Sequence, residues 1–98
     1  GGQDAGPGPH ELLCTALATC TAITLRMYAD RKGWAMRSIG VATRMERSQH
    51  GAVVDTRLHV ELDLDGDLDD DQRQRLHQIA RACPVHRTLL NPIQIEIH

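Results

Sequence analysis

The sequence holds 98 residues, with 11 basic and 13 acidic side chains, a formal net charge of −2 and 2% aromatic residues. This length predicts a single domain over residues 1–98 with a modest core, and because a core without Phe lacks large rings, we expect a homodimer. The charge balance indicates no partner nucleic acid or anionic membrane, and no uninterrupted apolar segment approaches the roughly 18 residues of a membrane span.

The first predicted element is a long helix. A Gly/Pro loop, GGQDAGPGP, precedes it, and Pro9 suits the first turn because its missing N–H costs nothing there. From Glu11 to Lys32 the chain reads as one helix that stops at Gly33. The segment from Leu12 to Leu25 carries no charge on any face, which predicts a buried central helix.

A β-hairpin is expected to follow this helix. Apolar and polar residues alternate from Ile39 to Glu46, and after a turn at His50-Gly51 the alternation becomes strict from Val54 to Leu64. A period of two predicts antiparallel strands that turn one face towards the core and the other towards water.

The acidic run DLDGDLDDDQ resembles a calcium loop at first sight. It fails the register of such a loop, because Gln74 stands where the bidentate Glu is required, and we expect no metal there. The run instead predicts a turn at Gly66 and a helix that is capped by Asp67 and extends to about Ala82.

The C-terminal part completes an α+β protein. Pro84 predicts the start of a short helix, Pro92 its end, and the alternating isoleucines from Ile93 to Ile97 predict a last strand. The expected order is therefore helix, strand, strand, helix, short helix, strand.

The three cysteines are the candidates for chemistry. Their odd number does not make a secreted disulfide framework, which favours a cytoplasmic protein with reduced thiols. Cys14 and Cys20 lie in the apolar helix, where most free cysteines are packing residues. Cys83 differs because it precedes a helix start, where free N–H groups, with His86 and Arg87 nearby, lower the pKa of a thiol.

Three functional interpretations of Cys83 remain open from the residues alone. The stretch CPVH resembles a thioredoxin-like site, but that motif follows a strand and here it follows a helix. A zinc site needs about four ligands, whereas Cys20, Cys83 and His86 supply three at most. A redox pair of Cys20 with Cys83 requires only that the fold bring two inward-facing thiols together.

The two cysteine segments together resemble one protein family. GPGPHELLCTALATCTAITLRMYADRKGW is similar to the signature of the OsmC/Ohr family, the osmotically inducible and organic hydroperoxide resistance proteins. GDLDDDQRQRLHQIARACPVHRTLLNPIQIEI resembles the C-terminal half of that family, and the likeness is strongest to its OsmC-like branch. The resemblance implies an intertwined homodimer, with the long helix buried between sheets and active sites at the interface.

The resemblance also implies a thiol peroxidase of oxidative stress defence that needs no cofactor and no metal. Cys20 would attack the O–O bond of an organic hydroperoxide and become a sulfenic acid. Cys83 would condense with it to a disulfide, which an external dithiol reductant then reduces. Glu11 would supply the carboxylate of the site, one position later than in the family, where His10 stands here.

The resemblance departs from the family at the N-terminus. Strands that precede the Gly/Pro loop, and an arginine on them, are absent from this sequence, which indicates a fragment or a shortened member. Arg26 or Arg87 would then replace the missing cation. Two alternative functions stay open, a non-catalytic dimeric structural domain and an α+β module that binds a small ligand.

Overall fold

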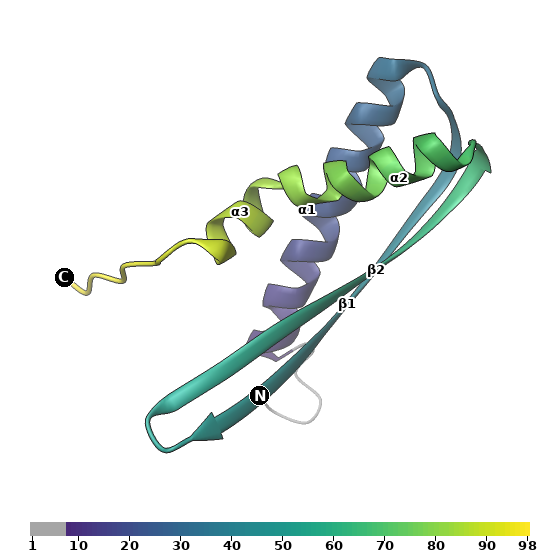
Figure 1. Ribbon diagram of the computed structural model, residues 1–98. Helices are drawn as coiled ribbons and strands as arrows, with labels where there is room; N and C mark the ends of the chain where they lie inside the picture. The colour runs from purple at the N-terminus through teal and green to yellow at the C-terminus, as the bar shows by residue number, and fades with distance from the viewer. Residues whose placement is uncertain (1–7) are drawn as a thin grey trace.

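A computed structural model describes residues 8–98, which form three α-helices, one turn of 3-10 helix (η1) and a two-stranded sheet (Figure 1). The elements follow in the order α1 (Pro9–Lys32), β1 (Ala35–His50), β2 (Val53–Asp67), α2 (Asp70–Ile79), η1 (Ala80–Ala82) and α3 (Pro84–Leu90). The predicted α+β class is confirmed, as is the predicted order as far as α3.

Helix α1 begins and ends where local chemistry favours its ends. Pro9 occupies its first turn, and the Glu11 carboxylate accepts the backbone N–H of Gly8 at 3.2 Å. Gly33 ends the helix with φ 70° and ψ 25°, a left-handed conformation that strains a residue with a Cβ atom. The Gly33 N–H reaches the carbonyl of Asp30 at 3.1 Å, so the last turn is closed by the glycine that the sequence indicated.

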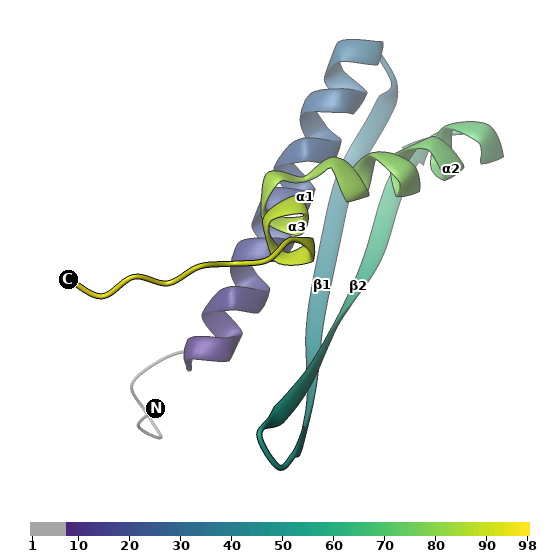
Figure 2. The ribbon, with the colours of Figure 1, turned by 60° about the vertical axis from the view of Figure 1, so that its left-hand side comes forward.

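The hairpin pairs β1 with β2 in an antiparallel register that puts the predicted apolar faces together. Ile39 lies opposite Leu64 and Met45 opposite Leu58, so both apolar stripes share one face of the sheet. Helix α1 covers β1 on this face, and the Thr43 hydroxyl donates to the Cys14 carbonyl at 2.6 Å. Figure 2 shows α1 running alongside the hairpin, with α2 in front of the strands and α3 in front of α1.

The core lies where the C-terminal half of α1, the base of the hairpin and α2 meet. Leu25 and Leu76 have no exposed surface, and they pack with three further buried residues, Ala29, Met36 and Leu64. Tyr28 and Trp34 pack against this cluster. Their two rings meet each other edge to face, with centroids 5.5 Å apart. Aliphatic packing thus supplies most of the burial in a chain with two aromatic residues.

Helix α2 starts two residues later than predicted. Its cap is Asp69, whose carboxylate accepts the N–H of Gln72 at 2.8 Å while the Gln72 side chain accepts the N–H of Asp69 at 2.9 Å. The predicted cap, Asp67, is instead the last residue of β2, where it pairs with Ala35. The reciprocal Asp–Gln pair therefore determines the start, not the acidic run as such.

The predicted strand from Ile93 to Ile97 is wrong for this chain, because residues 92–98 form no regular element. The tail points away from the hairpin (Figure 1), and Ile97 is 95% exposed. A strand forms only against a neighbour that completes its hydrogen bonds, and among the described residues no strand pairs with this segment.

Helix α1 is buried along one face of the single chain. Leu17, Thr21, Leu25 and Ala29 recur every four residues and face the rest of the fold, whereas Ile23 on the opposite side is 55% exposed. By length and composition α1 could also cross a membrane, a test that the core helices of soluble proteins pass as well.

We expect replacement of Leu76 by Ala to lower the free energy of unfolding by about 2–5 kcal/mol, because it empties a site with no exposed surface. Gln74→Ala, on the exposed side of the same helix, should change it by less than about 0.5 kcal/mol. Urea titrations followed by circular dichroism measure both values. Equal midpoints for the two variants would show that α2 is not anchored through Leu76.

Candidate functional site

The fold brings Cys20 and Cys83 together. Cys20 lies on α1 and Cys83 lies between η1 and α3, and the two thiols are close enough for each to shift the pKa of the other. Cys83 has no exposed surface, whereas Cys20 is partly accessible. All three cysteines are free, and the third, Cys14, lies about 1.7 turns before Cys20, on another side of α1.

The position of Cys83 follows from the residue after it. Pro84 cannot continue a helix that requires its N–H but suits a first turn, so the chain ends η1 and opens α3 at this point. Cys83 is thereby the N-cap of α3, and its carbonyl accepts the N–H of Arg87 at 3.1 Å. The backbone N–H groups of Val85 and His86, in the first turn of α3, help to lower the pKa of its thiol.

The pKa of Cys83 lies below the ordinary value of a thiol. Burial alone would raise it, but hydrogen bonds to the thiolate outweigh burial. The largest of these comes from the Cys20 thiol, followed by the backbone N–H of His86 and the hydroxyl of Thr21. The helix start predicted to favour this thiolate therefore contributes, although the neighbouring thiol contributes more.

The pKa of Cys20 is shifted in the opposite direction. Burial raises it most, and the hydrogen bond to Cys83 raises it further, because a Cys20 thiol that donates to a thiolate holds its own proton. The backbone N–H of Val85 and the side chain of Thr24 oppose this rise without cancelling it.

The pair therefore loses its first proton as a unit, and the resulting negative charge rests mainly on Cys83. The more acidic sulfur is the buried one, and the accessible sulfur is the one that keeps the proton. A proton that moves along the hydrogen bond from Cys20 to Cys83 places the charge on the accessible atom.

Two threonines next to the pair were not identified from the sequence. Thr21 is 2% exposed and its hydroxyl donates to the Leu17 carbonyl at 2.7 Å. Thr24, one turn after Cys20, donates to the Cys20 carbonyl at 2.8 Å. The stretch CTAIT carried a signal for Thr24 alone, because the fourth position after a helical cysteine lies on its side of the helix, whereas the next position, Thr21, does not.

A groove of about 750 Å³ lies between α1, β2 and the α2–α3 segment, and Thr21 and His86 line it whereas the two thiols do not. Thr21 forms part of its wall and links it to Cys83. β2 lines the groove with the apolar side chains of Leu58, Val60 and Leu62, and the α2–α3 segment adds basic ones, His77, Arg81 and His86. The groove thus combines an apolar floor with a polar wall near the buried sulfur.

Glu11 lies apart from the two thiols in this chain. Its carboxylate caps α1 through the Gly8 N–H, and with His10 and Cys14 it lines a second cavity of about 780 Å³. Glu11 and Cys20 are nine positions apart on α1, about 13.5 Å along the helix axis. The structure brings Cys20 and Cys83 together and leaves Glu11 outside that contact.

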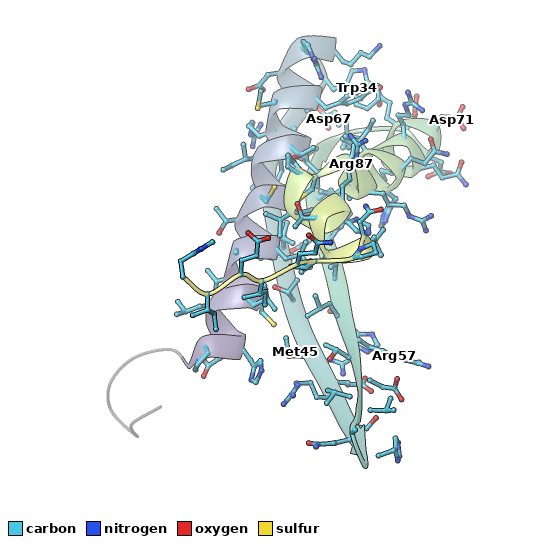
Figure 3. All side chains as sticks on the ribbon, turned by 90° about the vertical axis from the view of Figure 1, so that its left-hand side faces the viewer. Trp34, Met45, Arg57, Asp67, Asp71 and Arg87 are labelled. Carbon is cyan, nitrogen blue, oxygen red and sulfur yellow. The ribbon has the colours of Figure 1, made fainter. Side chains whose placement is uncertain are left out.

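The two arginines suggested as substitutes for a missing cation also lie away from the pair. Arg26 donates to the Met36 carbonyl at 2.9 Å and lies 3.8 Å from Asp30, at the other end of α1. Arg87 extends from the exposed side of α3 (Figure 3). Neither is among the main influences on the pKa of Cys20 or Cys83, and the basic side chains nearest the groove are Arg81 and the histidines.

The fold and the site define an α+β protein in which a long helix and a helix cap present two interacting thiols. The family model described as OsmC-like protein matches residues 1–98, and the chain belongs to the OsmC-like family. The resemblance seen in the two cysteine segments is thus confirmed. The search of curated proteins found no match.

Solved structures of similar fold carry related names. An OsmC-like protein from Mycoplasma pneumoniae has a TM-score of 0.78 at 20% identity, over 88% of this chain and 64% of that one. An organic hydroperoxide resistance protein OsmC from Legionella pneumophila has a TM-score of 0.76 at 15% identity, over 91% of this chain and 66% of that one. An OsmC-like hydroperoxide resistance protein from Jannaschia sp. CCS1 has a TM-score of 0.73 at 23% identity, over 97% of this chain and 67% of that one. This chain therefore spans about two thirds of their length, and the likeness shows the fold.

The opposed pKa shifts predict how the thiols titrate. Because hydrogen bonds lower the pKa of Cys83, thiolate should form in the parent protein at a lower pH than in a free thiol. Cys20→Ala removes the largest of those hydrogen bonds, so the first midpoint should move to higher pH. Absorbance at 240 nm against pH measures it, with Cys14→Ala as a control that keeps the parent midpoint. An unchanged midpoint in Cys20→Ala would contradict the shared ionisation.

Proposed function

We propose that the protein is a cytoplasmic thiol peroxidase that reduces organic hydroperoxides through a Cys20/Cys83 redox pair, in defence against oxidative stress. The observation that carries the proposal is the contact between an accessible thiol and a buried, more acidic one in a chain of the OsmC-like family. The names of two solved relatives, which include hydroperoxide resistance, agree with it.

In the first proposed step, the accessible sulfur attacks the peroxide. Proton transfer from Cys20 to Cys83 creates the Cys20 thiolate, which forms an S–O bond as the O–O bond breaks. The leaving alkoxide takes a proton from water and departs as the alcohol, while Cys20 becomes a sulfenic acid. Two electrons pass from sulfur to the peroxide. The apolar floor of the neighbouring groove suits the organic part of such a substrate.

In the second step, Cys83 attacks the Cys20 sulfenic acid, a disulfide forms and water leaves. An external dithiol then has to reduce this disulfide. Since Cys83 is fully buried, the reductant reaches the Cys20 sulfur, and Cys83 is the leaving thiolate. A leaving thiol of low pKa accelerates this exchange, so the groups that stabilise the Cys83 thiolate favour reduction.

The proposal includes a homodimer. Apolar side chains on the uncovered side of α1 and on the C-terminal tail are more than half exposed in the single chain: Leu12, Ile23, Met27, Ile93, Ile95 and Ile97. An exposed apolar surface of this kind marks a protein interface. Glu11, our proposed carboxylate of the site, would reach the thiols only from a second copy, because Cys20 of its own chain lies nine positions farther along α1.

The dimer has its own test. We expect sedimentation equilibrium to give twice the chain mass of 10.9 kDa, and Ile23→Asp to shift the protein towards monomer because the charge would be buried at the interface. Gln74→Asp, a similar change on the exposed side of α2, should leave the mass unchanged. If the parent protein sediments as a monomer, the proposed homodimer and the proposed role of Glu11 are both wrong.

One observation favours a second function. The groove of about 750 Å³ is large enough for a small ligand, which agrees with a non-catalytic binding domain in which both cysteines are packing residues. Turnover of peroxide separates the two, because a binding domain consumes none.

The peroxidase is tested with one equivalent of cumene hydroperoxide and disulfide mapping by mass spectrometry. We expect a Cys20–Cys83 disulfide in the parent protein and in Cys14→Ser, which keeps both proposed redox thiols. Cys20→Ser should lose peroxide consumption, and Cys83→Ser should stop after one turnover with a sulfenic acid on Cys20 that dimedone traps. If Cys20→Ser consumes peroxide as fast as the parent, the mechanism is wrong.

A further inference from the structure

Two threonine side chains of α1 lie next to the paired thiols. The Thr21 side chain helps to lower the pKa of Cys83, and the Thr24 side chain opposes the rise in the pKa of Cys20. Both lie on α1, three residues apart, and thus on neighbouring parts of one helix face. Thr21 is also buried to 2% exposure, so water does not compete for its hydroxyl.

Each hydroxyl has one proton and two possible acceptors. Thr21 donates to the Leu17 carbonyl at 2.7 Å, and Thr24 donates to the Cys20 carbonyl at 2.8 Å. Both carbonyls belong to the helix and already accept a backbone N–H, so the threonine proton is an additional donor there. A hydroxyl that rotates about its C–O bond can offer that proton to a sulfur instead, at no cost in helix hydrogen bonds.

The ionisation state of the thiols determines whether each threonine hydroxyl donates to the helix carbonyl or to the sulfur. A neutral thiol accepts hydrogen bonds weakly, so the carbonyl keeps the proton while both cysteines are protonated. A thiolate is a charged acceptor, and a charge-assisted hydrogen bond is about twice as strong as a neutral one. The other donors to the pair are backbone N–H groups of Val85 and His86, which the α3 start holds in place, so the threonines are the donors that can turn.

We propose that Thr21 and Thr24 are positioning residues that divide the negative charge of the ionised pair between its sulfurs, Thr21 holding it on Cys83 and Thr24 drawing it to Cys20. This assignment rests on the proposed redox pair and deepens it. The Thr21 bond keeps the resting charge on a sulfur that solvent does not reach. The Thr24 bond stabilises the same charge once it moves to the accessible sulfur, which is the one that would meet a peroxide.

The experiment separates the sulfurs before it tests the threonines. Cys14→Ala/Cys20→Ala leaves Cys83 as the single thiol, and Cys14→Ala/Cys83→Ala leaves Cys20. In each background, thiolate absorbance at 240 nm is followed against pH for Thr21→Val, Thr24→Val and the two matched serine variants. Valine keeps the shape of threonine without its donor, and serine keeps the donor without the methyl group. Circular dichroism confirms that each variant is folded.

We expect each threonine to affect the pKa of one sulfur only. Thr21→Val should raise the pKa of Cys83 by about one unit, which is tenfold less thiolate at a pH below the midpoint, and should leave Cys20 unchanged. Thr24→Val should raise the pKa of Cys20 and leave Cys83 unchanged. Each serine variant should restore the parent midpoint.

Two results would overturn the assignment. One is an unshifted midpoint of Cys83 in Thr21→Val or of Cys20 in Thr24→Val. The other is a shift that serine does not restore, because that shift would come from packing. The titration needs no peroxide, so its outcome is independent of the proposed function. If each threonine shifts the pKa of its own sulfur but the protein consumes no cumene hydroperoxide, the charge division stands and the peroxidase is rejected.

Discussion

The packing of one face of α1 is the constraint on which the rest of the structure depends. Four residues at a spacing of one turn bury this face against the hairpin and the C-terminal helices: Leu17, Thr21, Leu25 and Ala29. The hairpin has two strands and cannot be stable on its own, and α2 and α3 are too short to form alone. Each of these elements therefore takes its place from α1.

The same face also assembles the candidate site. Thr21 belongs to the buried stripe, and Cys20 and Thr24 flank it, so the packing that holds the fold also fixes these side chains relative to α3. Cys83 lies where η1 ends and α3 begins, and the backbone restriction of Pro84 places this boundary. The sites of the two thiols are thus determined by the most strongly buried parts of the chain.

Local chemistry made much of the fold predictable. Pro9, Gly33 and Pro84 act through their own backbone restrictions, which is why the bounds of α1 and the start of α3 were readable from the sequence. The start of α2 was misplaced because four aspartates between positions 67 and 71 could each cap a helix, and only the partner Gln72 distinguishes Asp69. The last strand failed because a strand is defined by a neighbour, which the spacing of isoleucines does not reveal.

The candidate site was predictable in part for the same reason. The acidity of Cys83 followed from its place at a helix start, whereas its contact with Cys20 depended on how two distant segments pack, and the family resemblance supplied it. Thr21 and Thr24 were missed because threonines in a helix are ordinarily structural. Their importance arises only from the sulfurs that the fold places beside them.

In the proposed peroxidase, the complete burial of Cys83 also bears on how long the protein survives exposure to peroxide. A sulfenic acid that meets a second peroxide becomes a sulfinic acid, a form that thiols do not restore. In this fold the partner thiol already touches Cys20, so condensation needs no search by a mobile loop and competes well against a second collision. The partner itself is shielded from the oxidant. The arrangement would favour durability at high peroxide concentrations over retention of a sulfenic acid as a signal.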